Sequence, residues 1–323
     1  MNEKPDMMIN IYGGNNLIAP VASSAIQNFY GDRGDEAADQ PEDSEKTENT
    51  ESVADEKPAQ EPAELSDDEF YVSVYTEAMD RAMEGGIDDV GLGVLFGLEL
   101  YRYEFAGLLM HAEHLEAVHG VGPHTISVPR ICPADDIDPS AFDNSISDDI
   151  FEKLVACIRI SVPYTGMIVS TRESQRARER VLHLGISQIS GGSRTSVGGY
   201  AEPEKENDSA QFDVSDNRTL DEVVGWLMEL GYIPSFCTAC YRAGRTGDRF
   251  MSLCKSGQIQ NCCHPNALMT LKEYLVDYAS PHVKELGDEL IAKEIHNIPN
   301  EKVRELVERH LKDIEEGERD FRI

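Results

Sequence analysis

The sequence predicts an α/β fold in which about five parallel strands form an open sheet or part of a (β/α)8 barrel. Two observations lead to this prediction. From residue 71 onward, short apolar runs alternate with helical stretches of about 10–15 residues, which is the pattern of βαβ units. The runs number five, whereas a closed (β/α)8 barrel needs eight strands. We therefore expect a partial barrel, preceded by a disordered acidic region and followed by a helical segment.

The first 69 residues differ in composition from the rest of the chain. Residues 34–69 contain 15 acidic and two basic residues and no aromatic residue. Such a stretch cannot bury enough apolar surface to offset its ordering entropy, so we expect a disordered acidic linker. Residues 1–33 precede it and include an apolar island at 8–12, whose alternation predicts one strand followed by a turn at 13–16. This first segment receives no function.

The remaining elements follow one another in the order that a parallel sheet requires. We expect the strands at 89–96, 124–129, 166–170, 186–190 and 232–236. Apolar spacing predicts helices at 78–83, 98–118, 150–161, 174–183 and 220–230. Residues 268–323 read as three helical pieces broken at Ser280-Pro281 and at Pro299. We divide this part into a barrel region, 70–236, and a C-terminal region, 237–323.

Net charge and apolar patterning exclude several classes of partner. The formal net charge is −31, which repels nucleic acid phosphates and anionic lipid, so we expect neither nucleic acid nor a membrane as partner. No stretch approaches 18 uncharged apolar residues, and no basic segment followed by an apolar segment opens the chain. We expect a cytoplasmic protein, in which seven cysteines are free thiols or metal ligands.

The cysteines near the C-terminus form the strongest local signal. Cys237 and Cys240 have CxxC spacing, and Cys263 follows after 22 residues. Two thiolates at this spacing can bind one metal centre, and the arginines and glycines between them can donate hydrogen bonds to cluster sulfides. Cys254 and Cys262 are further candidates. Spacing alone leaves an iron–sulfur cluster and a zinc site completed by His264 equally open.

Polar residues also flank two of the expected strands. Ser170 and Arg172 follow the strand at 166–170, and the carboxyl ends of parallel strands face the active site. A guanidinium there can bind a carboxylate through two hydrogen bonds, although pairing with Glu173 is the plainer alternative. His124 precedes a strand and so lies at the opposite pole, where a structural role is the plainer alternative. The glycine-rich stretch 191–199 and the Gly91-x-Gly93 pair match no nucleotide-binding fingerprint.

Together, five segments of the chain resemble the radical S-adenosylmethionine (SAM) tyrosine lyases of the HydG and ThiH families, and the CTACYR segment favours HydG. The segments are GIDDVGLGVLFGL (86–98), GPHTISVPR (122–130), STRES (170–174), SGGSRT (190–195) and CTACYR (237–242) with Cys263. The resemblance runs from residue 71 to 323. It implies a (β/α)8 barrel whose [4Fe–4S] cluster cleaves SAM, so that tyrosine breaks into p-cresol and dehydroglycine. It also implies an auxiliary cluster with a labile iron, where CO and cyanide for an iron–carbonyl–cyanide synthon arise.

The resemblance assigns roles to individual residues. The auxiliary cluster would be bound by Cys237, Cys240 and Cys263, with His124 holding the labile iron. The tyrosine carboxylate would be held by Ser170 and Arg172. The SAM pocket would be lined by Gly91, Gly93 and Phe96. Tyrosine and the hydrogenase maturation proteins are the implied partners.

One departure from the family limits these implications. The CxxxCxxC motif that binds the SAM cluster is absent, since only Cys132 and Cys157 lie outside the C-terminal group, 25 positions apart. We expect a chain that matches HydG without its N-terminal third and its first three strands. Such a chain is not expected to cleave tyrosine by itself. The alternatives are an iron–sulfur or zinc-binding scaffold without catalysis and a ThiH-like tyrosine lyase of thiamine synthesis.

Overall fold

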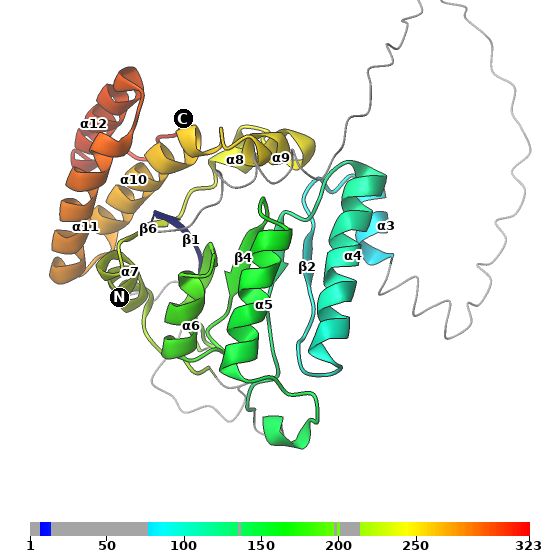
Figure 1. Cartoon of the computed structure of the whole chain (residues 1–323). Helices are drawn as coiled ribbons and strands as arrows, with labels where there is room; N and C mark the ends of the chain where they lie inside the picture. The colour runs from blue at the N-terminus through cyan, green and yellow to red at the C-terminus, as the bar shows by residue number, and fades with distance from the viewer. Residues whose placement is uncertain (1–6, 14–76, 135–136, 197–198, 201–213) are drawn as a thin grey trace, which may run out of the picture.

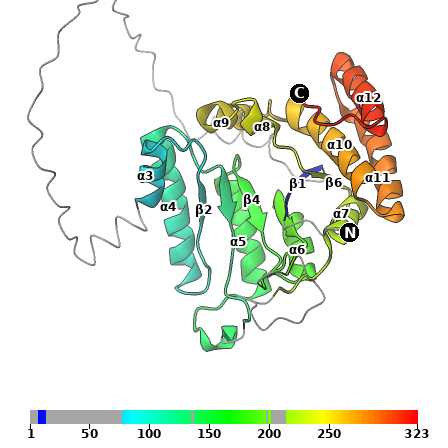
Figure 2. The ribbon, with the colours of Figure 1, turned by 180° about the vertical axis from the view of Figure 1, so that it is seen from behind.

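The computed structural model describes residues 7–13, 77–134, 137–196, 199–200 and 214–323, and these form one six-stranded sheet with its helices. The strand order is β2-β3-β4-β5-β1-β6. The helices α10, α11 and α12 gather at one end of the molecule, and α3 and α4 lie at the other end (Figures 1 and 2). The expected acidic linker at 34–69 and the turn at 14–16 lie outside the described residues.

Four strands of the sheet pair in parallel, which confirms the predicted α/β class. They are β2 (Gly91–Gly93), β3 (Thr125–Ser127), β4 (Gly166–Val169) and β5 (Gln188–Gly191). The connecting helices are α4 (Tyr101–His119), α5 (Asp148–Ser161) and α6 (Gln175–Leu182). At the centre of the sheet, Ile126 pairs with Leu92 on one side and with Met167 on the other. All three side chains are buried.

The fifth expected strand does not join this parallel ladder directly. β6 (Tyr232–Ser235) runs in the same direction as β5, but β1 (Met7–Gly13) lies between them and is antiparallel to both. Ile9 pairs with Ile189 of β5, and Ile11 pairs with Pro234 of β6. The parallel ladder therefore has four strands rather than five. Local alternation identified the strand at 8–12, but it contains no information about which neighbours the strand pairs with.

Helix-capping residues set the starts of the later helices. α7 (Leu220–Glu229) begins with a capping box formed by Thr219 and Glu222. The Ser280 side chain caps α11 (Pro281–Glu294), and the Asn300 side chain caps α12 (Glu301–Glu315). These caps satisfy backbone N–H groups that have no partner within the helix. The helix breaks expected at Ser280-Pro281 and Pro299 are confirmed.

The segment between β6 and α11 contains more helix than the sequence predicted. α8 (Ala239–Arg242) and α9 (Gly247–Lys255) follow β6, and α10 (Gln260–Asp277) begins well before residue 268. Short elements complete the fold, namely α3 (Ala78–Glu84), η2 (Pro139–Ala141) and η3 (Ile295–Asn297). Cys263 thus lies in the first turns of a helix rather than in a loop.

One hydrophobic core joins the sheet to the C-terminal helices. It includes Val90 beside β2, Ile189 of β5, Leu268 of α10 and Ile314 of α12. α10 packs against β6, α11 and α12. The core is therefore continuous across residue 236, where we placed a boundary between two regions. Within the described part of the chain, no helix has both the length and the apolar character needed to cross a membrane.

Candidate metal centre

The CxxC pair lies directly after β6, and backbone hydrogen bonds fix its first cysteine. The amide of Cys237 donates to Oγ of Ser235 at 3.3 Å, and the amide of Ala239 donates to Sγ of Cys237 at 3.4 Å. Cys240 follows on α8 and is half-buried. Because α8 is a single turn, the two thiols come from one tight bend of the chain, as a shared metal centre requires.

Arg245 connects this bend to the cysteines of α10. Its amide donates to the carbonyl of Cys240 at 2.8 Å. Partial burial lowers the pKa of the Arg245 guanidinium. A hydrogen bond to Cys240 and the charges of Cys240, Cys262 and Cys263 raise this pKa, and the net shift is upward. Nη2 donates to the carbonyl of Ile323 at 2.9 Å, and Nε is buried with no hydrogen-bond partner. The guanidinium of Arg245 therefore lies near the thiols, and its Nε–H group is available to donate a hydrogen bond.

Cys254 is buried on α9 and interacts electrostatically with cysteines of α8 and α10. Burial, and to a smaller extent the charges of Cys263, Cys240 and Asp89, raise the pKa of Cys254 to about 12. Burial also raises the pKa of Cys237, whereas the amide of Ala239 and the charge of Arg245 lower it. Cys254, on α9, is therefore a protonated thiol that interacts electrostatically with Cys240 and Cys263, two of the three expected cluster ligands.

His124 lies next to the cysteine segment although it is far from it in sequence. Its ring centroid is 4.5 Å from that of Phe250 on α9 and 6.3 Å from that of Tyr241 on α8. Its Nδ1 is 3.4 Å from Oδ1 of Asp89. Burial lowers the pKa of His124, and the charge of Asp89 opposes that shift. The chain thus places the expected iron ligand and the expected cluster ligands in one region.

The donor set fits a thiolate-bound anionic cluster better than the zinc alternative. Several thiols and an arginine donor without a partner suit a sulfide-containing group, whose sulfurs accept hydrogen bonds. In contrast, Nε2 of His264, the residue expected to complete a zinc site, lies 3.6 Å from Oε2 of Glu294 on α11. Among the residues that the structure describes, no three His, Cys, Asp or Glu side chains are arranged to hold a single ion.

The carboxyl ends of the strands carry the second predicted group. Ser170 and Arg172 follow β4, and the amide of Arg172 donates to Oγ of Ser170 at 3.2 Å. Nη2 of Arg172 reaches the carbonyl of Cys132 at 3.4 Å. The neighbouring Glu173, offered as the plainer partner of Arg172, accepts from Nη2 of Arg130 at 2.6 Å. Ser170 and Arg172 are both half-buried at this pole.

The residues expected to line the SAM pocket divide into two groups. Gly91 and Gly93 are exposed on β2, where a Cβ on Gly93 would lie 3.1 Å from the carbonyl oxygen of Ser127. Their small size is thus accounted for by the close approach of β3. Phe96 is 0% exposed and lies in the hydrophobic core. Their proposed contact with SAM remains a prediction.

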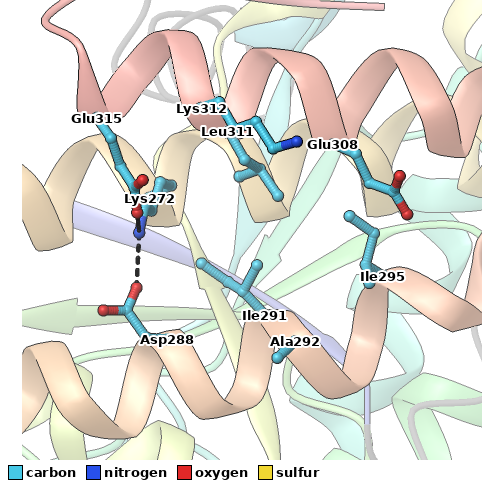
Figure 3. A pocket seen from close by; sticks show the side chains of 9 residues that line it. All are labelled: Lys272, Asp288, Ile291, Ala292, Ile295, Glu308, Leu311, Lys312 and Glu315. Atoms are coloured by element: carbon cyan, nitrogen blue, oxygen red, sulfur yellow. Dashed lines mark hydrogen bonds and ion pairs between the residues drawn. The ribbon is translucent and has the colours of Figure 1, made fainter.

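A separate hollow of about 530 Å³ lies between the C-terminal helices and contains none of the predicted site residues. Its charged feature is Lys272, whose Nζ is 2.8 Å from Oδ1 of Asp288 and 2.6 Å from Oε1 of Glu315 (Figure 3). Ile291, Leu311 and Ile295 form its apolar part. Lys272 lies on α10, Asp288 on α11 and Glu315 on α12. Because the ammonium group pairs with both carboxylates, it links these three helices.

Sequence reasoning missed two residues of the metal centre. Asp89 lies beside His124, and its Oδ1 accepts from the amide of Gly247 at 2.9 Å. Asn266 is buried, and it exchanges two hydrogen bonds with the backbone of Ile323. A signal for Asp89 did exist, because it and His124 each precede one of two neighbouring strands. Asn266 had no such signal.

Comparison with known proteins relates this geometry to one group. Residues 127–233 match the model of the biotin and thiamin synthesis associated domain. The 2-iminoacetate synthase of Escherichia coli (strain K12) is 32% identical over 161 residues, which is 49% of this chain and 41% of that protein. The 2-iminoacetate synthase of Salmonella typhimurium (strain LT2) is 29% identical over 160 residues, with the same two coverages.

Solved structures give a stronger match. A crystal structure of HydG, a maturase of the [FeFe]-hydrogenase, superposes with a TM-score of 0.75 and 54% identity, covering 82% of this chain and 56% of that one. HydG from Carboxydothermus hydrogenoformans superposes with a TM-score of 0.58 and 40% identity, covering 73% and 50%. This chain thus spans about half the length of the relatives it matches, in sequence and in structure.

Proposed function

From the relationship of this chain to HydG, the maturase of the [FeFe]-hydrogenase, we propose that it binds the auxiliary iron–sulfur cluster of a HydG-type maturase. Cys237, Cys240 and Cys263 would ligate the cluster, and His124 would hold its labile iron. The approach of His124 to the segment that carries the CxxC motif is the observation that supports this most strongly. The higher identity to HydG than to 2-iminoacetate synthase favours HydG over a ThiH-like lyase.

The residues around the thiols would have distinct tasks. The Arg245 guanidinium would donate its free Nε–H to a cluster sulfur and offset part of the negative charge. Phe250 packs against the imidazole of His124 and restricts water on that side. When bound, the auxiliary cluster supplies an iron centre for CO and cyanide. Cys254, protonated and buried, would remain beside the cluster without being one of its three ligands.

At the other pole, we propose that Ser170 and Arg172 hold the carboxylate of tyrosine. A guanidinium and a hydroxyl at the carboxyl ends of parallel strands form a suitable anion site. The residues of this chain do not fit the cluster that cleaves SAM, because no CxxxCxxC motif occurs in the sequence. The chain alone is therefore expected to form no radical and to release no p-cresol.

Anaerobic reconstitution with iron and sulfide tests the cluster assignment. The wild-type chain should take up about four to five irons, whereas Cys240→Ala should lose most of them. Cys157→Ala is the matched control, since Cys157 is an exposed thiol on α5. Iron and zinc are counted in each protein, and the reduced cluster is examined by electron paramagnetic resonance (EPR).

Each result of this experiment has one meaning. Iron retained in Cys157→Ala and lost in Cys240→Ala supports the proposal. About one zinc per chain, or equal iron in both variants, contradicts the cluster assignment.

A further inference from the structure

We propose that Asp89 is the positioning residue for His124, holding the imidazole by Nδ1 so that Nε2 is the nitrogen presented to the labile iron. The inference rests on the proposed function, because it assumes an iron at His124. It concerns a carboxylate that neither the CxxC motif nor the segments around His124 identify. Its basis is a contact between the loop before β2 and the residue before β3.

The geometry leaves Asp89 as the group that faces Nδ1. Oδ1 of Asp89 lies 3.4 Å from Nδ1 of His124, and Nδ1 is buried and makes no hydrogen bond. The two ring nitrogens of an imidazole point in opposite directions, so this contact turns Nε2 away from Asp89. Phe250 and Tyr241 flank the ring, which limits its rotation. The imidazole therefore has one orientation in which its second nitrogen is free for a ligand.

Asp89 is itself fixed from the far side. Its Oδ1 accepts from the amide of Gly247, the first residue of α9, at 2.9 Å. Gly247 has a φ of +52°, a backbone conformation that residues with a side chain rarely adopt, so glycine allows the turn that directs this amide toward Asp89. Oδ2 of Asp89 is buried and has no hydrogen-bond partner. A buried carboxylate oxygen without a partner is costly, which is typical of a group kept for its effect on a neighbour.

This arrangement is the usual one behind a metal-binding histidine. Such a histidine donates its other ring N–H to a carboxylate, which fixes the tautomer and makes the ligand more basic. At 3.4 Å the contact is longer than a hydrogen bond. Iron at Nε2 would draw electron density from the ring, strengthen Nδ1–H as a donor and shorten the contact.

The adjacent Asp88 provides a matched control. Its Oδ2 accepts from the hydroxyl of Thr246 at 2.7 Å, so it ties the same loop to α9 without contacting His124. Asp88→Ala and Asp89→Ala therefore each remove one carboxylate that anchors this loop to the start of α9. Only the second removes the group that faces the imidazole.

The test uses the full chain loaded with its [4Fe–4S] cluster and titrated with 57Fe(II) as probe. Binding of the additional iron is measured by equilibrium dialysis and Mössbauer spectroscopy, with His124→Ala as reference. Asp89→Ala should weaken that iron by about 10–100-fold while leaving the cluster iron intact. Asp88→Ala should stay within about twofold of wild type, and Asp89→Asn, which keeps an oxygen, should recover part of the loss.

Three results would overturn the inference. Wild-type affinity in Asp89→Ala would show that the carboxylate does not position His124. Equal weakening in Asp88→Ala would assign the effect to loop anchoring. Absence of any His124-dependent iron in a cluster-loaded wild-type chain would remove the premise, and absence of the cluster itself would contradict the proposed function.

Discussion

Replacing Asp216 with asparagine tests how the residues directly before α7 are held against β5. Asp216 and Arg178 are paired with both side chains 0% exposed, and Arg178 also donates to the carbonyl of Ser190 in β5. Burial raises the pKa of Asp216, but hydrogen bonding and charge from Arg218 and the charge of Arg178 lower it overall. Breaking a buried pair by removing one charge costs about 3–5 kcal/mol, because the other charge stays buried without compensation.

The single tryptophan of the chain provides the assay. Trp226 lies 4.1 Å from the guanidinium carbon of Arg218 and 5.8 Å from that of Arg178. Urea unfolding followed by its fluorescence should show the midpoint of Asp216→Asn lowered by about 1–2 M, assuming an m-value of about 3 kcal/mol/M. The control is a half-buried ion pair between Arg180, on the same helix α6 as Arg178, and Glu152 on α5.

The prediction is tested by comparing the loss of unfolding free energy in the two variants. Arg180→Ala should cost less than about 1 kcal/mol, since the Arg180 side chain is 39% exposed and solvent screens its charge. If Asp216→Asn costs no more than Arg180→Ala, the buried pair does not hold the residues before α7 against β5 and our reasoning is wrong.

Two further predictions concern thiol reactivity and pH. Cys254 should resist iodoacetamide at pH 8 in the metal-free folded chain while the exposed Cys157 reacts, because burial raises the pKa of Cys254 to about 12; peptide mass spectrometry that finds equal labelling would contradict this. The pKa of Asp80 is lowered below 3.8, first by the hydrogen bond from His119 and also by His114. A carboxyl with a depressed folded-state pKa stabilises the fold above its unfolded pKa, and the effect is lost as pH falls through the folded value. The difference in melting temperature between wild type and Asp80→Asn should therefore shrink below about pH 4, and a difference that is constant down to pH 2.5 would refute it.

Local patterns in the sequence were sufficient to predict the order of the elements. Apolar periodicity identified the strands and helices from β2 to β6, and Ser280-Pro281 identified the start of α11, because these signals act within a few residues. The position of β1 was not predictable in this way. Its partners, Ile189 and Pro234, are far away in sequence, and strand alternation is the same for any neighbour.

The candidate metal centre shows the same limit for side chains. The CxxC spacing predicted a metal site because its ligands come from one turn. The contact of Asp89 with Gly247 joins residues 158 positions apart, and it depends on how α8 and α9 cross from β6 to the start of β2. The pairing of Glu173 with Arg130 spans 43 positions and likewise follows from the adjacency of β3 and β4. Neither of these two long-range contacts can be predicted from the spacing of residues in the sequence.

The strands also set the separation of the two proposed sites. His124 precedes Thr125, which pairs with Gly166, the first residue of β4, whereas Ser170 and Arg172 follow the last residue of that strand. A strand rises about 3.3 Å per residue, so the four residues of β4 place about 13 Å between the two poles. No side chain can serve both sites across that distance. The proposed carboxylate-binding pair and the candidate metal centre therefore lie at opposite ends of the parallel strands, and a small product formed at one of them would have to travel along the sheet to reach the other.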